Sequence, residues 1–345
     1  MKRRSSSVSC RACFGLVGLL ALVLAGPLAP VRAAELAEVM KSVPFQIVYE
    51  SFRDGNWELY QANADGSQAV NLTRTPEVQE MYPHVSPDGS KICFLVDEGE
   101  DKAKSRNVYV MNRDGSGRER VAVNGRDPCF SPDGTAVVYL PGEFEEFTLR
   151  DYATKGISVF DLATRQHRPH PNSEIHHLYN ICCTADGKWF VATVHAGMGF
   201  SHAILAIEAQ GKRVVNLQIP GCRPDLTPDG KRIAWGASDF TICVADLDFS
   251  GPEPKIVNRR DAIRSEKPNE VYHADWSPDG KYLTFSRGPQ QKKKLGAAPE
   301  MIGAQAEGWE ICVAEAEAPN RWMAITTDGK SNKEPDWAPA RTGQP

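Results

Sequence analysis

A tetrapeptide recurs five times along this chain of 345 residues and limits its fold more than any other feature. Each copy has Ser or Thr, then Pro or Ala, then Asp-Gly, and a short apolar or β-branched run follows it. Pro presets the backbone of a tight turn, Asp caps the turn, and Gly accepts a positive φ. Each copy therefore predicts a turn between two strands, and the copies lie at 86–89, 131–134, 184–187, 227–230 and 277–280.

The spacing of these turns predicts the architecture. Their first residues lie 45, 53, 43 and 50 residues apart, which is the period of four-stranded propeller blades. Residues 47–72 supply only three strands of a blade, and residues 334–339, which match 273–278, supply one strand more. The sequence predicts an all-β fold: a six-bladed β-propeller of four-stranded antiparallel blades, closed by a C-terminal strand that completes the first blade.

The repeats resemble the TolB-type propeller repeat, a WD40-like family with Pro-Asp-Gly turns. The strongest matches are residues 82–112, with Asn-Val-Tyr-Val-Met-Asn at 107–112, and residues 274–285. The resemblance covers about 44–340 and implies a single six-bladed propeller there. It implies little about function, because binding proteins, transport accessories and hydrolase side domains share the scaffold. We expect neither the α/β domain of TolB itself nor a serine hydrolase, since the chain has no Gly-x-Ser-x-Gly motif.

The first 33 residues are typical of an export signal. Lys2, Arg3, Arg4 and Arg11 precede an apolar stretch at 14–25, and Val31-Arg32-Ala33 forms a small-residue cleavage site. Cleavage would change the formal net charge from −4 to −9, because the segment carries five basic residues and no acid. We therefore expect a periplasmic or secreted protein with no integral membrane segment after cleavage and no nucleic-acid partner.

Seven cysteines follow the predicted cleavage site, and most lie in predicted strands. We favour buried free thiols over disulfides, because equivalent strand positions of different blades are usually too far apart to bridge. No paired Cys-x-x-Cys zinc spacing occurs after residue 33, and no cofactor is expected. The seven are Cys93, Cys129, Cys182, Cys183, Cys222, Cys243 and Cys312.

The topology predicts two different faces of the disc. The Pro-Asp-Gly turns should lie on one face, and the loops between second and third strands and between blades should lie on the other. Four long segments, 97–106, 141–155, 259–270 and 287–307, are predicted to be loops of this second face. Binding loops on a rigid scaffold are expected there.

The innermost strands predict a polar central channel. Side chains alternate along a strand, so the residues two and four positions before each Ser or Thr should share the channel side. Asp225, Asp275 and Asp336 have a second interpretation, in which they tie their strands to neighbouring backbone. The candidate ligand-binding residues are His84, Asp127, Asn180, Arg223, His273, Asp275, Glu334 and Asp336.

Three classes of function follow from these features. We favour an exported, non-catalytic binding or assembly scaffold that presents its loop-rich face and channel to a protein, peptide or glycan of the cell envelope. The alternative is a metal-dependent enzyme on acidic oligosaccharides, resembling oligogalacturonate lyases; the third class is a purely structural envelope module. Candidate ligands for a divalent metal in the enzyme are His84, His177, His195, His202 and His273.

Overall fold

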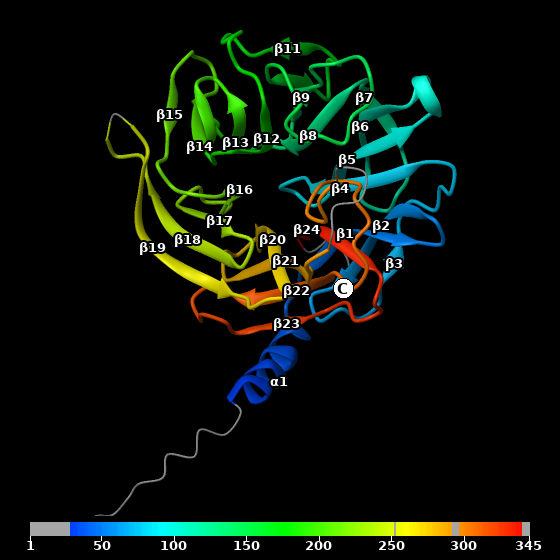
Figure 1. Cartoon of the computed structure of the whole chain (residues 1–345), viewed down its shortest axis with the longest axis vertical. Helices are drawn as coiled ribbons and strands as arrows, with labels where there is room; N and C mark the ends of the chain where they lie inside the picture. Colours follow the sequence, from blue (N-terminus) through cyan, green and yellow to red (C-terminus); the bar gives the residue numbers. More distant parts are fainter. Residues whose placement is uncertain (1–27, 252, 292–296, 340–345) are drawn as a thin grey trace, which may run out of the picture.

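The computed structural model describes residues 28–251, 253–291 and 297–339. Six four-stranded antiparallel sheets surround a common axis (Figure 1). The predicted six-bladed β-propeller is confirmed. In each of blades 2 to 6, the first strand in the chain is the innermost one and the last lies at the rim.

The first three blades contain twelve strands. Blade 1 consists of β24 (Ser331–Ala338), β1 (Gln46–Arg53), β2 (Asn56–Asn63) and β3 (Val70–Asn71). Blade 2 consists of β4 (Gln79–Val85), β5 (Lys91–Glu98), β6 (Ser105–Asn112) and β7 (Glu119–Ala122), with the 3₁₀ helix η1 (Asp101–Ala103) before β6. Blade 3 consists of β8 (Gly125–Phe130), β9 (Ala136–Pro141), β10 (Ser158–Asp161) and β11 (His167–Pro169).

The other three blades repeat the same order. Blade 4 consists of β12 (Leu178–Cys183), β13 (Trp189–Gly197), β14 (Phe200–Glu208) and β15 (Val214–Asn216). Blade 5 consists of β16 (Cys222–Leu226), β17 (Arg232–Ser238), β18 (Thr241–Asp248) and β19 (Lys255–Arg264). Blade 6 consists of β20 (Asn269–Trp276), β21 (Tyr282–Pro289), β22 (Glu310–Glu315) and β23 (Trp322–Ala324).

The ring closes through the pairing of β24 with β1, as predicted. Ile47 lies opposite Trp337 and Val48 opposite Asp336 in this antiparallel ladder. Trp337 is buried among Tyr49, Ile311 and Val313, so the closing strand also packs against blade 6. The C-terminal strand is thus the innermost strand of a blade whose other three strands come from the start of the propeller.

The recurrent turns have the geometry that their sequence predicts. In the first copy, the Gly89 amide donates to the Ser86 carbonyl at 2.8 Å, and Gly89 has a φ of 71°. The Ser86 hydroxyl donates to the Asp88 carboxylate at 2.6 Å and holds the pKa of this carboxyl below its usual value. The hydroxyl-to-carboxylate bond recurs in the other four copies, so one local device fixes all five turns.

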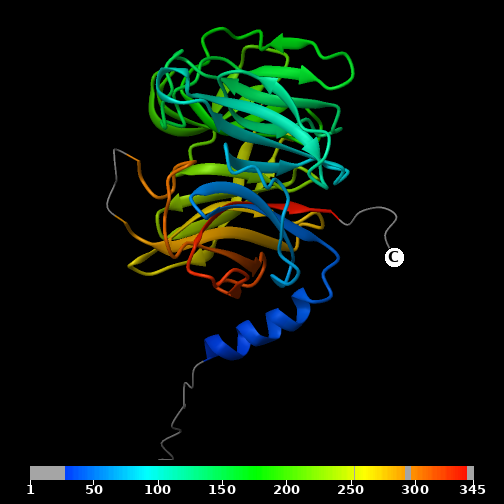
Figure 2. The same ribbon diagram turned by 90° about the vertical axis from the view of Figure 1, so that its right-hand side faces the viewer.

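Helix α1 (Leu28–Met40) precedes the propeller and projects from the edge of the disc (Figure 2). Leu36 and Met40 are buried near the end of this helix, in the cluster that includes Ile47 and Ala62 of blade 1. The predicted signal peptide, residues 1–33, lies outside the described residues except for 28–33, which begin α1. Within the described ranges, no helix is both long and apolar enough to cross a membrane.

One loop prediction is wrong. Residues 259–264 are not a loop but the second half of β19, which pairs with β18. Two register shifts interrupt that ladder, and Asn258 has a φ of 55°. Because these irregularities and the side chains, most of which are exposed or half-buried, remove the regular apolar alternation of a strand, the sequence pattern does not show β19.

Candidate functional site

The innermost strands carry one irregularity at the same place in every blade. The register shifts by one residue there, and the residue in the shift has a positive φ although none is glycine. Such a conformation is strained for a residue with a side chain. A β-bulge of this kind redirects a side chain, and here it marks the predicted channel ring: Tyr82, Asp127, Asn180, Arg223, His273 and Glu334.

Five residues of this ring line a small chamber on the axis, which has a volume of about 40 Å³. The side-chain amide of Asn180 donates to the Tyr82 hydroxyl at 2.9 Å and accepts from the Arg223 guanidinium at 3.1 Å. His273 Nε2 lies 2.9 Å from a Glu334 carboxylate oxygen. The chamber is thus lined by hydrogen-bonding groups that already bind one another.

A loop covers the chamber on the loop-rich face. We call residues 298–304, between β21 and β22, the cap; this segment crosses the axial region in orange in Figure 1. The Glu300 carbonyl accepts from Arg223 at 2.8 Å and from His273 at 2.9 Å. Lys333 donates to the carbonyls of residues 299 and 301 at 3.1 and 2.8 Å. Backbone carbonyls of the cap therefore satisfy the cationic side chains at this end of the channel.

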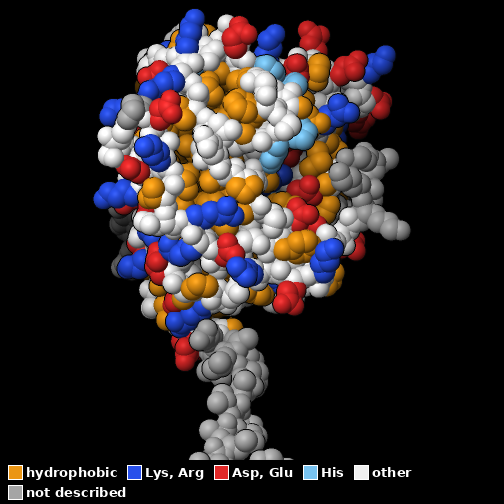
Figure 3. Space-filling view, turned by 60° about the vertical axis from the view of Figure 1, so that its left-hand side comes forward, with side chains coloured by type: hydrophobic (Ala, Val, Ile, Leu, Met, Phe, Trp, Pro, Cys, Tyr) orange, Lys and Arg blue, Asp and Glu red, His pale blue; other side chains and the backbone are white. Residues whose placement is uncertain are grey.

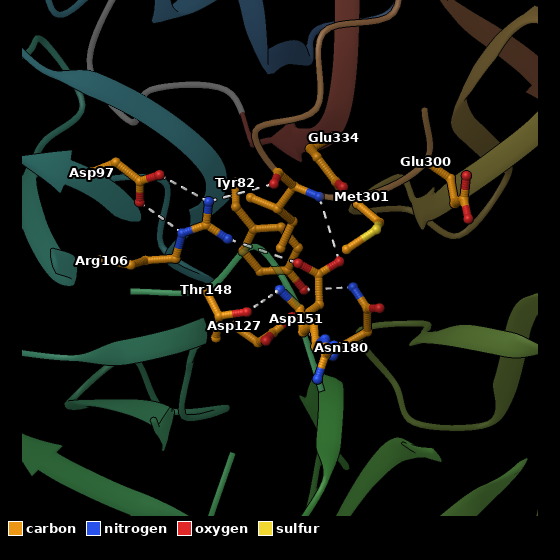
Figure 4. Close-up of polar contacts among 12 residues, drawn as sticks. Tyr82, Asp97, Arg106, Asp127, Thr148, Asp151, Asn180, Glu300, Met301 and Glu334 are labelled. Carbon is orange, nitrogen blue, oxygen red and sulfur yellow. Dashed lines mark hydrogen bonds and ion pairs between the residues drawn. The ribbon is translucent and has the colours of Figure 1, made fainter. Parts of the chain in front are cut away.

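Buried ion pairs continue beneath the cap. Arg106 donates to Asp97 at 2.7 Å and lies 3.8 Å from Asp151 (Figure 4). The other oxygen of Asp151 lies 3.6 Å from Arg223. Burial, and then Asp151, raise the pKa of Asp127 to about 7. Burial, and then the neighbouring Arg106, lower the pKa of Arg126 to about 10. This charge network is closely coupled and fully enclosed.

The channel residues two positions before each turn connect neighbouring blades. Asp225 accepts from the Trp276 amide and Asp275 from the Trp337 amide, both at 2.9 Å, and Asp336 accepts from the Val85 amide at 3.2 Å. These three carboxylates therefore tie each strand to the backbone of the next blade, as the second interpretation of the sequence proposes. Carboxylates also bind the backbone of the next blade at the channel ring. The backbone amide of Asn180 donates to Asp127, and the backbone amide of Tyr82 donates to Glu50.

Below the chamber the channel widens into a funnel of about 280 Å³ on the Pro-Asp-Gly face. Its floor consists of His84, Cys129, Cys182, Asp225, Asp275 and Asp336. Its wall is mostly apolar: Val85, Phe130, Cys183, Leu226, Trp276 and Trp337. Its rim consists of the second residue of each turn and the equivalent proline of blade 1: Pro87, Pro132, Ala185, Pro228, Pro278 and Pro339.

The funnel floor is acidic, and its groups influence one another. Burial raises the pKa of Asp225 to about 6, and burial with the charges of Asp336 and Asp225 raises the pKa of Asp275 well above its usual value. His84 Nδ1 lies 2.7 Å from Asp336. Burial acts to lower the pKa of His84, but Asp336 outweighs it and the pKa rises. The floor therefore favours ligand groups that donate hydrogen bonds or carry positive charge.

The eight predicted channel residues lie where the innermost strands place them. Six of them line the chamber, Asp336 lines only the funnel, and Asp127 is buried behind the chamber. Sequence reasoning missed Asp151 and Lys333, as well as the cap itself. Asp151 and the cap come from loops without a motif, and Lys333 stands one residue beyond the positions compared between repeats.

The five histidines proposed as metal ligands occupy two separate places. His84 and His273 lie on the channel, whereas the other three lie on blade 4, where the surface shows a patch of histidines (Figure 3). There, the rings of His195 and His202 are 5.8 Å apart, and His177 lies 3.0 Å from Glu143. In the part of the chain that the structure describes, no three His, Cys, Asp or Glu residues are grouped to hold a metal ion.

Comparisons with known proteins agree with this fold. A TolB homologue of Chlorobaculum tepidum is 32% identical over 87 residues, which is 25% of this chain and 18% of that protein. TolB from Acinetobacter baumannii has a TM-score of 0.61 at 20% identity, covering 90% of this chain and 71% of that one. A TolB-type structure from Agrobacterium tumefaciens has a TM-score of 0.53 at 15% identity, covering 84% and 91%. No family model matches the chain.

The fold and the polar axial channel define a β-propeller with a closed and an open end. The chain is a six-bladed β-propeller that is similar in fold to TolB and similar to a TolB homologue in sequence over 87 residues. The matched segment spans less than a fifth of the Chlorobaculum homologue, so that protein's activity and partners do not transfer with the fold.

Proposed function

We propose that this protein is an exported binding scaffold whose funnel receives a projecting segment of a partner protein of the cell envelope. The observation that carries the proposal is the asymmetry of the channel: the cap occupies one end, and a funnel of about 280 Å³ opens at the other. An apolar wall above a few polar groups is the usual composition of a binding site.

The chemistry of the funnel favours a peptide segment over a sugar. Its wall presents Phe130, Leu226, Trp276 and Trp337, which suit an apolar side chain, and its floor presents three carboxylates. A segment with an apolar residue beside a lysine, an arginine or a free amine would match both levels. Export follows from the predicted signal peptide, and the acidic mature chain supports a partner other than nucleic acid.

Site-specific photocrosslinking tests this proposal. A benzophenone amino acid replaces Ala185 at the funnel rim, in the cells that produce the protein. One control replaces the exposed Ala163, in the outer turn between β10 and β11 on the same face, and another replaces Ala103 in η1 on the opposite face. We expect a discrete protein adduct from position 185 alone.

A substitution in the floor separates the funnel from the rest of that face. Asp225→Asn removes a charge but keeps an oxygen that can accept from the Trp276 amide. We expect this variant to weaken the adduct at position 185 while the circular dichroism spectrum stays unchanged. Equal adducts from positions 185 and 163, or an adduct that Asp225→Asn leaves intact, would refute binding in the funnel.

A further inference from the structure

Two thiols of adjacent blades meet in the wall and floor of the funnel. Cys129 is on β8 of blade 3 and Cys183 is on β12 of blade 4, and their sulfur atoms are 4.0 Å apart. The two residues do not occupy equivalent repeat positions: Cys129 stands two residues before its turn and Cys183 stands one before. This offset brings together sulfurs that equivalent positions of two blades would keep apart.

We propose that Cys129 and Cys183 form a disulfide between blades 3 and 4 when the protein meets an oxidising compartment. A disulfide needs a sulfur separation of about 2.05 Å, so a change of about 2 Å from the present contact closes the bond. A rotation about the Cα–Cβ bond of a cysteine moves its sulfur by such an amount. The structure shows the reduced partners, since all seven cysteines that it describes are free.

The neighbouring thiols do not compete for this pairing. Cys182 precedes Cys183 on the same strand and turns to the other side, where its sulfur lies 3.5 Å from the Val191 carbonyl and 3.6 Å from the Pro224 carbonyl. Cys93 is completely buried. Cys183, in contrast, lines both the funnel and an adjoining hollow of about 370 Å³. Cys183 is therefore the thiol that an oxidant from solution reaches first.

The chemistry is a thiol–disulfide exchange with a small-molecule or protein disulfide as the oxidant. The Cys183 thiolate attacks one sulfur of the oxidant, forms a mixed disulfide and releases one thiolate. The Cys129 thiol loses its proton to water and attacks the Cys183 sulfur, which releases the second thiolate. The two cysteines lose two protons and two electrons, and the oxidant accepts the electrons. The hydrogen bond with Cys183 and burial raise the pKa of Cys129 well above its usual value, so the second step should be faster in alkaline buffer.

Mass spectrometry of the purified mature protein in a mixture of oxidised and reduced glutathione tests the proposal. Trypsin should release peptide 127–150 joined to peptide 166–188, and the intact mass should fall by about 2 Da. The cross-link closes a long loop, so the melting temperature should rise by roughly 5 °C on oxidation. Reduction with a phosphine should reverse both changes.

Single cysteine variants identify which two sulfurs form the disulfide. Cys183→Ala and Cys129→Ala should each abolish the joined peptides and the thermal shift, whereas Cys182→Ala should keep both; Cys243→Ala, on the distant β18, is the matched control. The unaltered protein alone decides the outcome if a variant fails to fold. A link through Cys182 or Cys93, a glutathione adduct on Cys183 without the internal bond, or no change of mass would overturn the inference. None of these results depends on the ligand of the funnel.

Discussion

The two ends of the channel are built from two positions of the same innermost strands, four and two residues before each turn, but serve different purposes. At the cap end, the strained ring of Arg223, His273 and Glu334 is buried, and its polar groups bind one another and the cap backbone. At the funnel end, the carboxylates tie neighbouring strands together, yet an open cavity remains beside them. The comparison indicates that polar residues close one end of the channel, whereas the apolar wall at the other end leaves room for a ligand.

Arg223→Ala should break the cap end and have the largest effect. The substitution removes the partner of Asn180 and of the Glu300 carbonyl, and it leaves Asp151 and Glu334 buried without this cation. Loss of one partner from a buried charge network typically costs about 3–5 kcal/mol. We expect a loss of this size in the free energy of unfolding, measured by urea denaturation. A loss below about 1 kcal/mol would show that the network is not closely packed.

His273→Ala should release the cap with a smaller loss of stability. The imidazole donates to the Glu300 carbonyl or to Glu334, and both lie 2.9 Å from Nε2. Loss of a buried hydrogen bond costs about 1–3 kcal/mol. Hydrogen–deuterium exchange should therefore increase in the cap, at residues 298–304, and remain unchanged in the funnel strands. The double variant of Arg223→Ala and His273→Ala should bind the partner as the native protein does, because the proposed site lies at the other end.

The pH dependence of stability should also distinguish the two ends. The folded state raises the pKa of Asp127 to about 7 and that of Asp225 to about 6, with burial as the main cause in both. Below these values the folded protein holds protons that the unfolded chain has released, so stability decreases as the pH rises from about 4 to about 7. Asp127→Asn should remove more of this decrease in the free energy of unfolding than Asp225→Asn does; the part removed is on the order of 1–3 kcal/mol.

Urea denaturation at several pH values between about 4 and 8 measures this slope for the native protein and both variants. In Asp127→Asn, the neutral side chain still has an oxygen that accepts from the backbone amide of Asn180, so the comparison isolates the effect of the charge. The two channel histidines also contribute to the pH dependence, with opposite signs: Asp336 outweighs burial to raise the pKa of His84, whereas burial lowers that of His273. Equal slopes in native protein and Asp127→Asn would contradict the assignment.

The sequence predicted the scaffold better than the site. The period of the Pro-Asp-Gly turns indicated six blades, and the match of 334–339 with 273–278 indicated how the ring closes. Alternation along the inner strands indicated which side chains face the axis. The cap could not be predicted, because its contacts are made by backbone carbonyls, which carry no signature in the sequence. The face with the long loops therefore looked like the open one.

Asp225→Asn should have the smallest effect on stability and the clearest effect on binding. The amide oxygen can still accept from the Trp276 amide, so the link between blades 5 and 6 survives. Removal of the buried charge offsets the weaker acceptor, so we expect the free energy of unfolding to change by about 1 kcal/mol or less at neutral pH. The lost charge lies on the funnel floor, where it would face a cationic group of the partner. If the variant unfolds much more easily, the carboxylate is mainly a structural tie and the funnel loses its proposed acidic role. If stability stays and the rim adduct disappears, the same position both holds the ring and recognises the ligand.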